Sequence, residues 1–136
     1  MSPGKLASQV AHASWAFLSN EIRGAGERVG GQLPNWTEVK ILIPNDVYDE
    51  WFCDIFTKTI CEAKNKNQLL KAKEIAEELG MKEGEDFFLI WDACKTELIP
   101  EMVDENGIGR TLTCIGFRPL DDETAWKISK KFQLYK

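Results

Sequence analysis

The order of strand-like and helix-like segments is the feature that most constrains the fold of this chain. Apolar and polar residues alternate from Glu38 to Ile43, which predicts a strand. Phe87 to Trp91 is a short, continuous apolar run, typical of a strand that is covered on both faces. Thr111 to Phe117 predicts another strand.

Helices are expected between and after these strands. Residues 47–63 carry a wide apolar surface and predict one helix, and residues 68–79 predict a second, with Gly80 as a left-handed C-cap. A final helix is expected from 121 or 122 to about 131, and a mobile, glycine-rich loop at 24–32. Strands that alternate with helices predict an α/β fold, here a three-layer α/β/α sandwich with a small mixed β-sheet.

The first helix carries a lysine at its start. Ser2 is a good N-cap, and Pro3 suits the first helical position. Lys5 then falls in the first turn, beside unpaired backbone N–H groups and the positive end of the helix dipole. A cation there works slightly against helix stability, whereas an anion would be attracted by both the ammonium and the helix N-terminus.

Polar residues share one face of this helix. Lys5, Gln9 and His12 have the spacing of neighbours on a helical surface. This spacing leaves two interpretations open, a polar seam at the edge of a site or an ordinary solvated helix face. The neighbouring apolar stripe, expected to face the core, consists of Leu6, Val10, Ala13 and Phe17.

Residues Met1 to Ala13, Met-Ser-Pro-Gly-Lys-Leu-Ala-Ser-Gln-Val-Ala-His-Ala, closely resemble the first-helix signature of the type II peptidyl-tRNA hydrolases. Further segments resemble the family in the same order. They are the strand at 38–43, Leu89 to Ala93 with its Asp-Ala ending, the Thr-Glu-Leu-Ile-Pro stretch within Lys95 to Pro100, and Thr111 to Gly116.

The resemblance implies hydrolysis of the ester that joins a peptide to the 3′ end of tRNA, without a cofactor or a metal. It implies that Asp92 orients or deprotonates water, that Lys5 binds the oxyanion or a terminal phosphate, and that Thr96 and Thr113 position water or the carbonyl. Gln9 and His12 are expected to hold this network. The remaining candidate substrate-binding or supporting residues are Gly4, Lys95 and Arg110.

The chain departs from the family pattern in three places. The family has a strand before the Gly-Lys helix, so a missing strand, a truncated start or a strand from a partner is expected, and a homodimer is one such arrangement. Tyr48 to Asn67 resembles an insertion rich in aromatic residues. Cys94 stands where the family has glycine, so a positive φ there would strain the backbone.

Each functional interpretation has an alternative. Asp92 could cap a turn, Thr113 could serve strand propensity alone, and Cys94 with His12 could form a thiol nucleophile, although nothing in the sequence positions that pair. The departures also favour an alternative function, a catalytically inactive tRNA- or protein-binding module on the same fold.

Composition favours one compact domain over residues 1–136. The sequence has no bilayer-length apolar run and no signal peptide, and its four cysteines lack a zinc-binding spacing, so we expect a cytoplasmic protein with reduced thiols and no membrane partner. The net charge of −5 means that an RNA partner requires a local basic patch. Candidates for this patch are Lys5, Arg23, Arg28, Lys95, Arg110 and Arg118.

Overall fold

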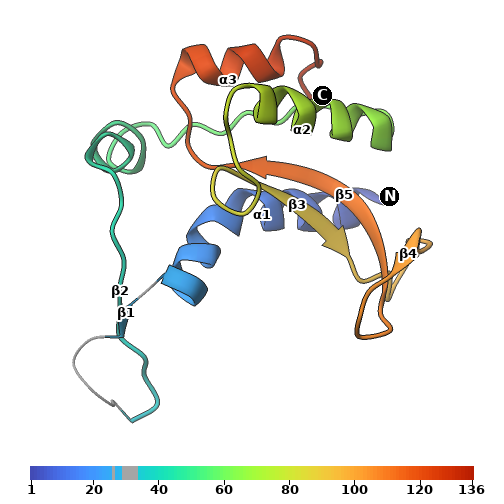
Figure 1. The fold of residues 1–136 in the computed structure, drawn as a ribbon, viewed down its shortest axis with the longest axis horizontal. Coiled ribbons are helices and arrows are strands. Elements are labelled where there is room, and N and C mark those ends of the chain that lie inside the picture. The colour runs from blue at the N-terminus through green and yellow to red at the C-terminus, as the bar shows by residue number, and fades with distance from the viewer. Residues whose placement is uncertain (26, 29–33) are drawn as a thin grey trace.

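Helices lie on both faces of a small sheet in the computed structural model, which describes residues 1–25, 27–28 and 34–136 (Figure 1). Helix α1 (Pro3–Asn20) contacts strands β3 (Phe87–Asp92) and β5 (Gly109–Phe117). Helices α2 (Lys66–Glu78) and α3 (Asp122–Ser129) contact each other on the opposite side of the sheet. The α/β fold predicted from the sequence is therefore confirmed, and so are the positions of these helices and strands.

The sheet is smaller than expected, and its described strands all pair antiparallel. Its order is β3-β5-β4, in which β4 (Met102–Val103) forms a hairpin with β5. The mixed sheet predicted from the sequence is not seen in the described residues, because the segment at 38–43 does not join it. Only Val39–Lys40 forms a strand there, β2, which pairs with β1 (Glu27–Arg28) in a separate two-stranded sheet.

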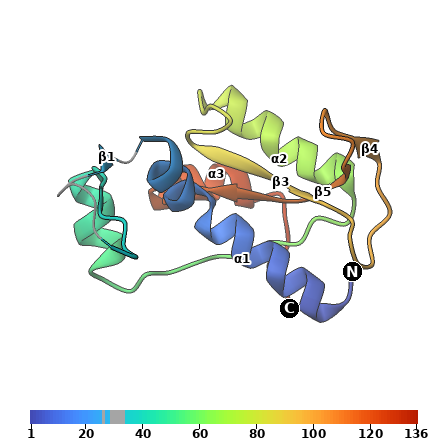
Figure 2. The same cartoon turned by 90° about the horizontal axis from the view of Figure 1, so that it is seen from below.

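The described residues between α1 and residue 52 lie at one end of the molecule, and residues 53–65 run back from there to α2 (Figure 2). A π-helical turn, η1 (Glu21–Ala25), extends α1. Of the loop predicted at 24–32, residues 26 and 29–33 lie outside the described residues, and the described part contains β1.

The helix predicted at 47–63 is wrong beyond its first turns. A π-helical turn, η2 (Val47–Phe52), is followed by irregular backbone, and Phe56 has a φ of 60°. The aromatic rings fold back on one another instead of lining a helix. Trp51 lies 4.9 Å from Phe52 and 5.9 Å from Phe17 of α1 between ring centroids, so the segment forms a small cluster at the end of α1.

The apolar core lies between the sheet and the α2–α3 pair. Phe87 and Ala76 are fully buried, and Ile128 of α3 is 5% exposed. Strand residues alternate between the faces of a sheet, so Phe87 and Trp91 face this core, whereas Asp92 faces α1. Among the described residues, no helix is long and apolar enough to cross a membrane.

Helix α1 rests directly on β5. A Cβ atom at Gly116 would lie 2.9 Å from the backbone carbon of Ala13, so only glycine permits this approach. The most buried residue of α1 is polar, because Gln9 is 2% exposed while the apolar stripe predicted from the sequence is only half-buried. The helix therefore presents a polar side chain to the α1-facing side of the sheet.

Candidate active site

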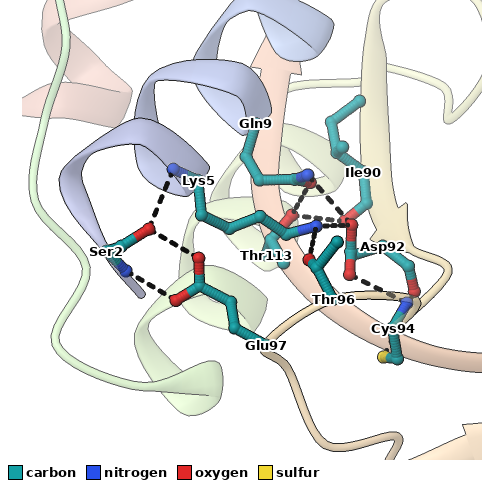
Figure 3. A network of polar contacts seen from close by, with 9 residues as sticks. All are labelled: Ser2, Lys5, Gln9, Ile90, Asp92, Cys94, Thr96, Glu97 and Thr113. Carbon is teal, nitrogen blue, oxygen red and sulfur yellow. Dashed lines mark hydrogen bonds and ion pairs between the residues drawn. The ribbon is translucent and has the colours of Figure 1, made fainter.

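An ion pair joins the first turn of α1 to the end of β3 (Figure 3). Lys5 Nζ lies 2.6 Å from Asp92 Oδ1, and the two side chains are only 15% and 9% exposed. Because little water surrounds the pair, its electrostatic attraction is screened less than that of a surface salt bridge. The pair brings together an ammonium and a carboxylate from residues far apart in the sequence.

Asp92 receives further hydrogen bonds on both oxygens. Gln9 Nε2 donates to Oδ1 at 3.1 Å, and the backbone N–H of Cys94 donates to Oδ2 at 2.8 Å. The hydrogen bond from Lys5 and these further donors lower the pKa of Asp92 below its ordinary value, although burial acts in the opposite direction. The carboxylate is therefore ionised at neutral pH.

Gln9 connects this carboxylate to strand β5. Thr113 Oγ1 donates to Gln9 Oε1 at 2.6 Å, while the amide nitrogen of Gln9 faces Asp92. An ionised carboxylate only accepts hydrogen bonds, so this contact fixes the orientation of the Gln9 amide. The two buried polar side chains of the described residues, Gln9 and Asp92, thus lie in contact with each other.

A β-bulge turns Thr113 toward α1. Ile90 pairs with Cys114 and Trp91 pairs with Leu112, so Thr113 is the extra residue on β5. Its hydroxyl also lies 3.1 Å from the carbonyl oxygen of Ile90. The bulge therefore places a hydroxyl on the face that carries Asp92.

The turn after β3 holds Asp92 through a strained residue. Cys94 has a φ of 54°, in the left-handed region that favours glycine. This conformation directs its backbone N–H to Asp92 Oδ2. The strain that the sequence predicted for a cysteine at this position is therefore present.

The segment after this turn contacts Lys5 directly through Thr96 and indirectly through the bonds between Glu97 and Ser2. Thr96 Oγ1 lies 3.3 Å from Lys5 Nζ. The carboxylate of Glu97 accepts hydrogen bonds from the Ser2 backbone N–H at 2.8 Å and from the Ser2 hydroxyl at 2.5 Å. Ser2 Oγ in turn accepts from the backbone N–H of Lys5 at 3.2 Å, which confirms Ser2 as the N-cap.

The arrangement leaves polar groups available for chemistry. After its contacts with Asp92 and Thr96, the Lys5 ammonium keeps a further N–H that can donate. Thr96 is exposed, so this side of the site is open to solvent. Among the described residues, no group of three His, Cys, Asp or Glu side chains could hold a metal ion. A cation, a fixed carboxylate and a hydroxyl can together bind a developing oxyanion and a water molecule.

Comparison with known proteins shows the family of this chain. The family model described as "Peptidyl-tRNA hydrolase PTH2" matches residues 1–135. The chain belongs to the PTH2 peptidyl-tRNA hydrolase family. The peptidyl-tRNA hydrolase of Methanopyrus kandleri is 32% identical, over 90% of this chain and 78% of that protein. Those of Thermococcus onnurineus and Thermoplasma acidophilum are 28% and 23% identical, each over 98% of this chain and over 86% and 87% of their own lengths.

Other residues that the PTH2 resemblance implied lie outside the network. His12 is exposed, and among the described hydrogen bonds none joins it to Asp92 or Gln9. It lies roughly 4.5 Å further along the axis of α1 than Gln9, beyond the end of the polar contacts. Lys95 and Gly4 are exposed beside the network. The supporting role expected for His12 therefore stays a prediction.

The residues named as candidates for a basic patch are dispersed in this PTH2 chain. Arg118 forms an ion pair with Asp86 at the opposite end of β3, and Arg23 follows the far end of α1. Arg110 contacts Asp104 through its Nε at 2.9 Å, within the β4–β5 hairpin. The side chain of Arg28 lies outside the described residues. Sequence order does not separate the two ends of the sheet, so it could not show that Arg118 and Arg23 lie away from Lys5.

Two features of the site were missed by sequence reasoning. Glu97 was recognised only as part of a family segment, although its bonds to Ser2 fix the start of α1. The bulge at Thr113 was also missed, because strand periodicity does not reveal an extra residue. Two signals in the sequence could have indicated the contact between Glu97 and Ser2. They are the polar Ser2 at the start of a predicted helix and the carboxylate of Glu97 close to the end of a predicted strand.

Proposed function

We propose that this chain hydrolyses the ester bond of peptidyl-tRNA at the site built around Lys5 and Asp92. The observation that carries the proposal is the partly buried ion pair, at 2.6 Å, between residues of two segments that the family resemblance singles out. Membership of the PTH2 family supports the same reaction. The cytoplasm, where translation produces peptidyl-tRNA, is the proposed location, and the four free cysteines agree with a reducing compartment.

Asp92 orients the attacking water in this proposal. A general base works best when its pKa lies near the working pH, whereas the donors around Asp92 lower its pKa. The carboxylate is therefore a weak base. Its Oδ2 accepts one described hydrogen bond, from Cys94, and retains a lone pair that can accept a hydrogen bond from water.

Lys5 stabilises the negative charge that develops on the ester carbonyl oxygen. Its position in the first turn of α1 adds the positive end of the helix dipole to the charge of the ammonium. Removing one such donor typically costs about 3 kcal/mol of transition-state stabilisation. Thr96, which contacts Lys5 and is exposed, positions the carbonyl or the water.

The reaction consumes one water molecule. The water oxygen bonds to the carbonyl carbon, and the bond from that carbon to the ribose oxygen breaks. The proton lost from the water is balanced by the proton that the ribose hydroxyl gains. Gln9 and Thr113 keep Asp92 in place, because each already donates or accepts within the network.

Contacts with the tRNA backbone are proposed for Lys95 and Arg110, and close approach of the substrate for Gly4. Lys95 is exposed in the turn beside Thr96, and a side chain at Gly4 would meet no protein atom within 4 Å. Each phosphate contact would make binding weaker as salt rises. Replacing Lys95 or Arg110 by alanine should therefore reduce the dependence of KM on salt.

A non-catalytic binding module remains the alternative function. The net charge of −5 and the exposed apolar residues of the inserted segment, such as Ile55 at 81% exposure, favour it. Exposed apolar surface also supports the proposal of a homodimer, which light scattering of the purified protein tests. The complete set of contacts between Lys5, Gln9, Asp92 and Thr113 favours catalysis.

Release of an N-blocked amino acid from its tRNA tests the proposed function. The wild-type chain should cleave N-acetyl-aminoacyl-tRNA, and Lys5→Ala and Asp92→Asn should each slow cleavage at least about tenfold. Glu78→Ala, an exposed glutamate at the end of α2, serves as a control for the loss of a charge. Absence of release by wild-type protein that still binds tRNA would favour the binding module.

A further inference from the structure

The Glu97 carboxylate forms the contact that ties the start of α1 to the segment after β3. Its two oxygens accept hydrogen bonds from two different groups of Ser2, the backbone N–H and the hydroxyl (Figure 3). A carboxylate that accepts two bonds at once fixes orientation as well as distance. We call this pair of bonds the Ser2–Glu97 clasp.

The clasp acts on the helix turn that carries Lys5. Ser2 Oγ donates to Glu97 and also accepts from the backbone N–H of Lys5, so the same hydroxyl connects Glu97 to Lys5. The residue before Glu97, Thr96, accepts from Lys5 Nζ. The backbone and the side-chain end of Lys5 are therefore both fixed to one short segment.

The segment that contains Thr96 and Glu97 follows Asp92 closely in the sequence. Asp92 ends β3, and its Oδ2 is held by the backbone N–H of Cys94. Displacement of the first turn of α1 would thus move Lys5 relative to Asp92 while leaving the rest of the sheet in place. Catalysis is sensitive to such displacements, since a shift of about 1 Å can cost on the order of a hundredfold in rate.

We infer that Glu97 is a positioning residue, which sets the Lys5–Asp92 geometry through Ser2 without touching the substrate. The inference rests on the catalytic roles proposed for Lys5 and Asp92. Glu97 is exposed, and the hydrogen bonds from Ser2 lower the pKa of its carboxyl group, so this group is ionised at neutral pH. Both donors of Ser2, its hydroxyl and its backbone N–H, form hydrogen bonds with Glu97.

Steady-state kinetics of Glu97→Ala test this role. The kcat for N-acetyl-aminoacyl-tRNA should fall about tenfold, while KM changes less than about twofold, because the geometry of the ion pair changes and the substrate contacts do not. The melting temperature should stay close to that of the wild type, since both partners of the clasp are exposed. Glu78→Ala is the matched control for removal of an exposed glutamate.

Ser2 provides the second arm of the experiment. Ser2→Ala removes the hydroxyl bond of the clasp and the N-cap bond to Lys5 but keeps the backbone N–H bond to Glu97, so it should lower kcat. In the double variant Ser2→Ala/Glu97→Ala the loss should be smaller than the product of the two single losses, because both changes break the bond between the hydroxyl and the carboxylate. Ser2→Thr keeps a hydroxyl and should restore most of the rate that Ser2→Ala loses. An unchanged kcat in Glu97→Ala, or multiplicative losses in the double variant, would overturn the inference.

Lys5→Ala distinguishes this inference from the proposed function. If Lys5→Ala is slow and Glu97→Ala is as fast as the wild type, only the positioning role of Glu97 fails. If Lys5→Ala is itself as fast as the wild type, the proposed function of the site fails. The positioning role of Glu97 then fails as well, because it depends on that function.

Discussion

Asp92 accepts hydrogen bonds from Lys5, Gln9 and Cys94, and these donors determine how the site responds to pH. They hold the pKa of Asp92 below its ordinary value of 3.8. A carboxyl group with a lowered folded-state pKa stabilises the fold above its unfolded pKa, and this contribution is lost as the pH falls through the folded value. The stabilisation that Asp92 contributes is therefore present at neutral pH and is lost only in strongly acidic solutions.

The pH dependence of hydrolysis follows from the same ionisation. The kcat/KM should stay level from about pH 7 down to about pH 5, because Asp92 remains ionised throughout this range. Measurement of kcat/KM for the wild type and His12→Ala checks this expectation. A loss of activity within this range that disappears in His12→Ala would show that the histidine, exposed here, takes part.

Replacement of Gly4 by alanine should have opposite effects on stability and on activity. Its position in the first turn of α1 has no conformational need for glycine, and an added Cβ would meet no protein atom within 4 Å. Gly4→Ala should therefore stabilise the protein by about 0.5 to 1 kcal/mol, because alanine favours the helix. The added methyl group would lie where we propose that the ester approaches, so kcat/KM should fall at least about fivefold. Thermal unfolding and kinetics together test this, and full activity in a stabilised variant would contradict it.

The bulge in β5 is the element that places Thr113 against Gln9. Thr113→Val keeps the shape of the side chain but leaves Gln9 Oε1 buried without its donor. We expect a loss of about 1 to 3 kcal/mol in the free energy of unfolding, together with slower hydrolysis. Thr113→Ser retains the hydroxyl and serves as the control in denaturant unfolding. Equal stability of the Val and Ser variants would show that the hydroxyl is unimportant.

The contact between α1 and β5 depends on Gly116. A methyl group there would meet the backbone of Ala13, which cannot move without displacing the helix. Gly116→Ala should destabilise the protein by about 1 to 3 kcal/mol and lower kcat, because Lys5 and Gln9 move with α1. The matched control is Gly24→Ala, at a position where an added Cβ meets no atom within 4 Å. A Gly116→Ala variant as active and stable as the wild type would contradict the observed packing.

Local patterns predicted some elements well and others poorly. The continuous apolar run from Phe87 to Trp91 predicted strand β3, and the helical repeat that ends at Gly80 predicted α2. Both local patterns agree with the tertiary structure. The helix at 47–63 was wrong because aromatic residues can pack on one another and on Phe17 without helical order. A pattern of apolar residues indicates burial, but it does not determine the backbone that achieves it.

Across the whole molecule, the sequence alone suggested the site residues mainly through the family resemblance. The spacing of Lys5, Gln9 and His12 left a solvated helix face equally open, and the structure separates His12 from the other two. Convergence of α1, β3 and β5 arises from long-range packing, such as the close approach at Gly116, that no local pattern encodes. The catalytic roles of Lys5, Asp92, Thr96 and Thr113 remain predictions.

The central claim is that Lys5 and Asp92 act as one unit, and a double-mutant cycle on single-turnover hydrolysis tests it most directly. The rate constant for N-acetyl-aminoacyl-tRNA would be measured for the wild type, Lys5→Ala, Asp92→Asn and the double variant, with circular dichroism confirming that each is folded. Because the two groups share a bond of 2.6 Å, each single change should slow the reaction at least about tenfold, and the double variant should be about as slow as the slower single variant. Single variants as fast as the wild type, or losses that multiply in the double variant, would contradict the account.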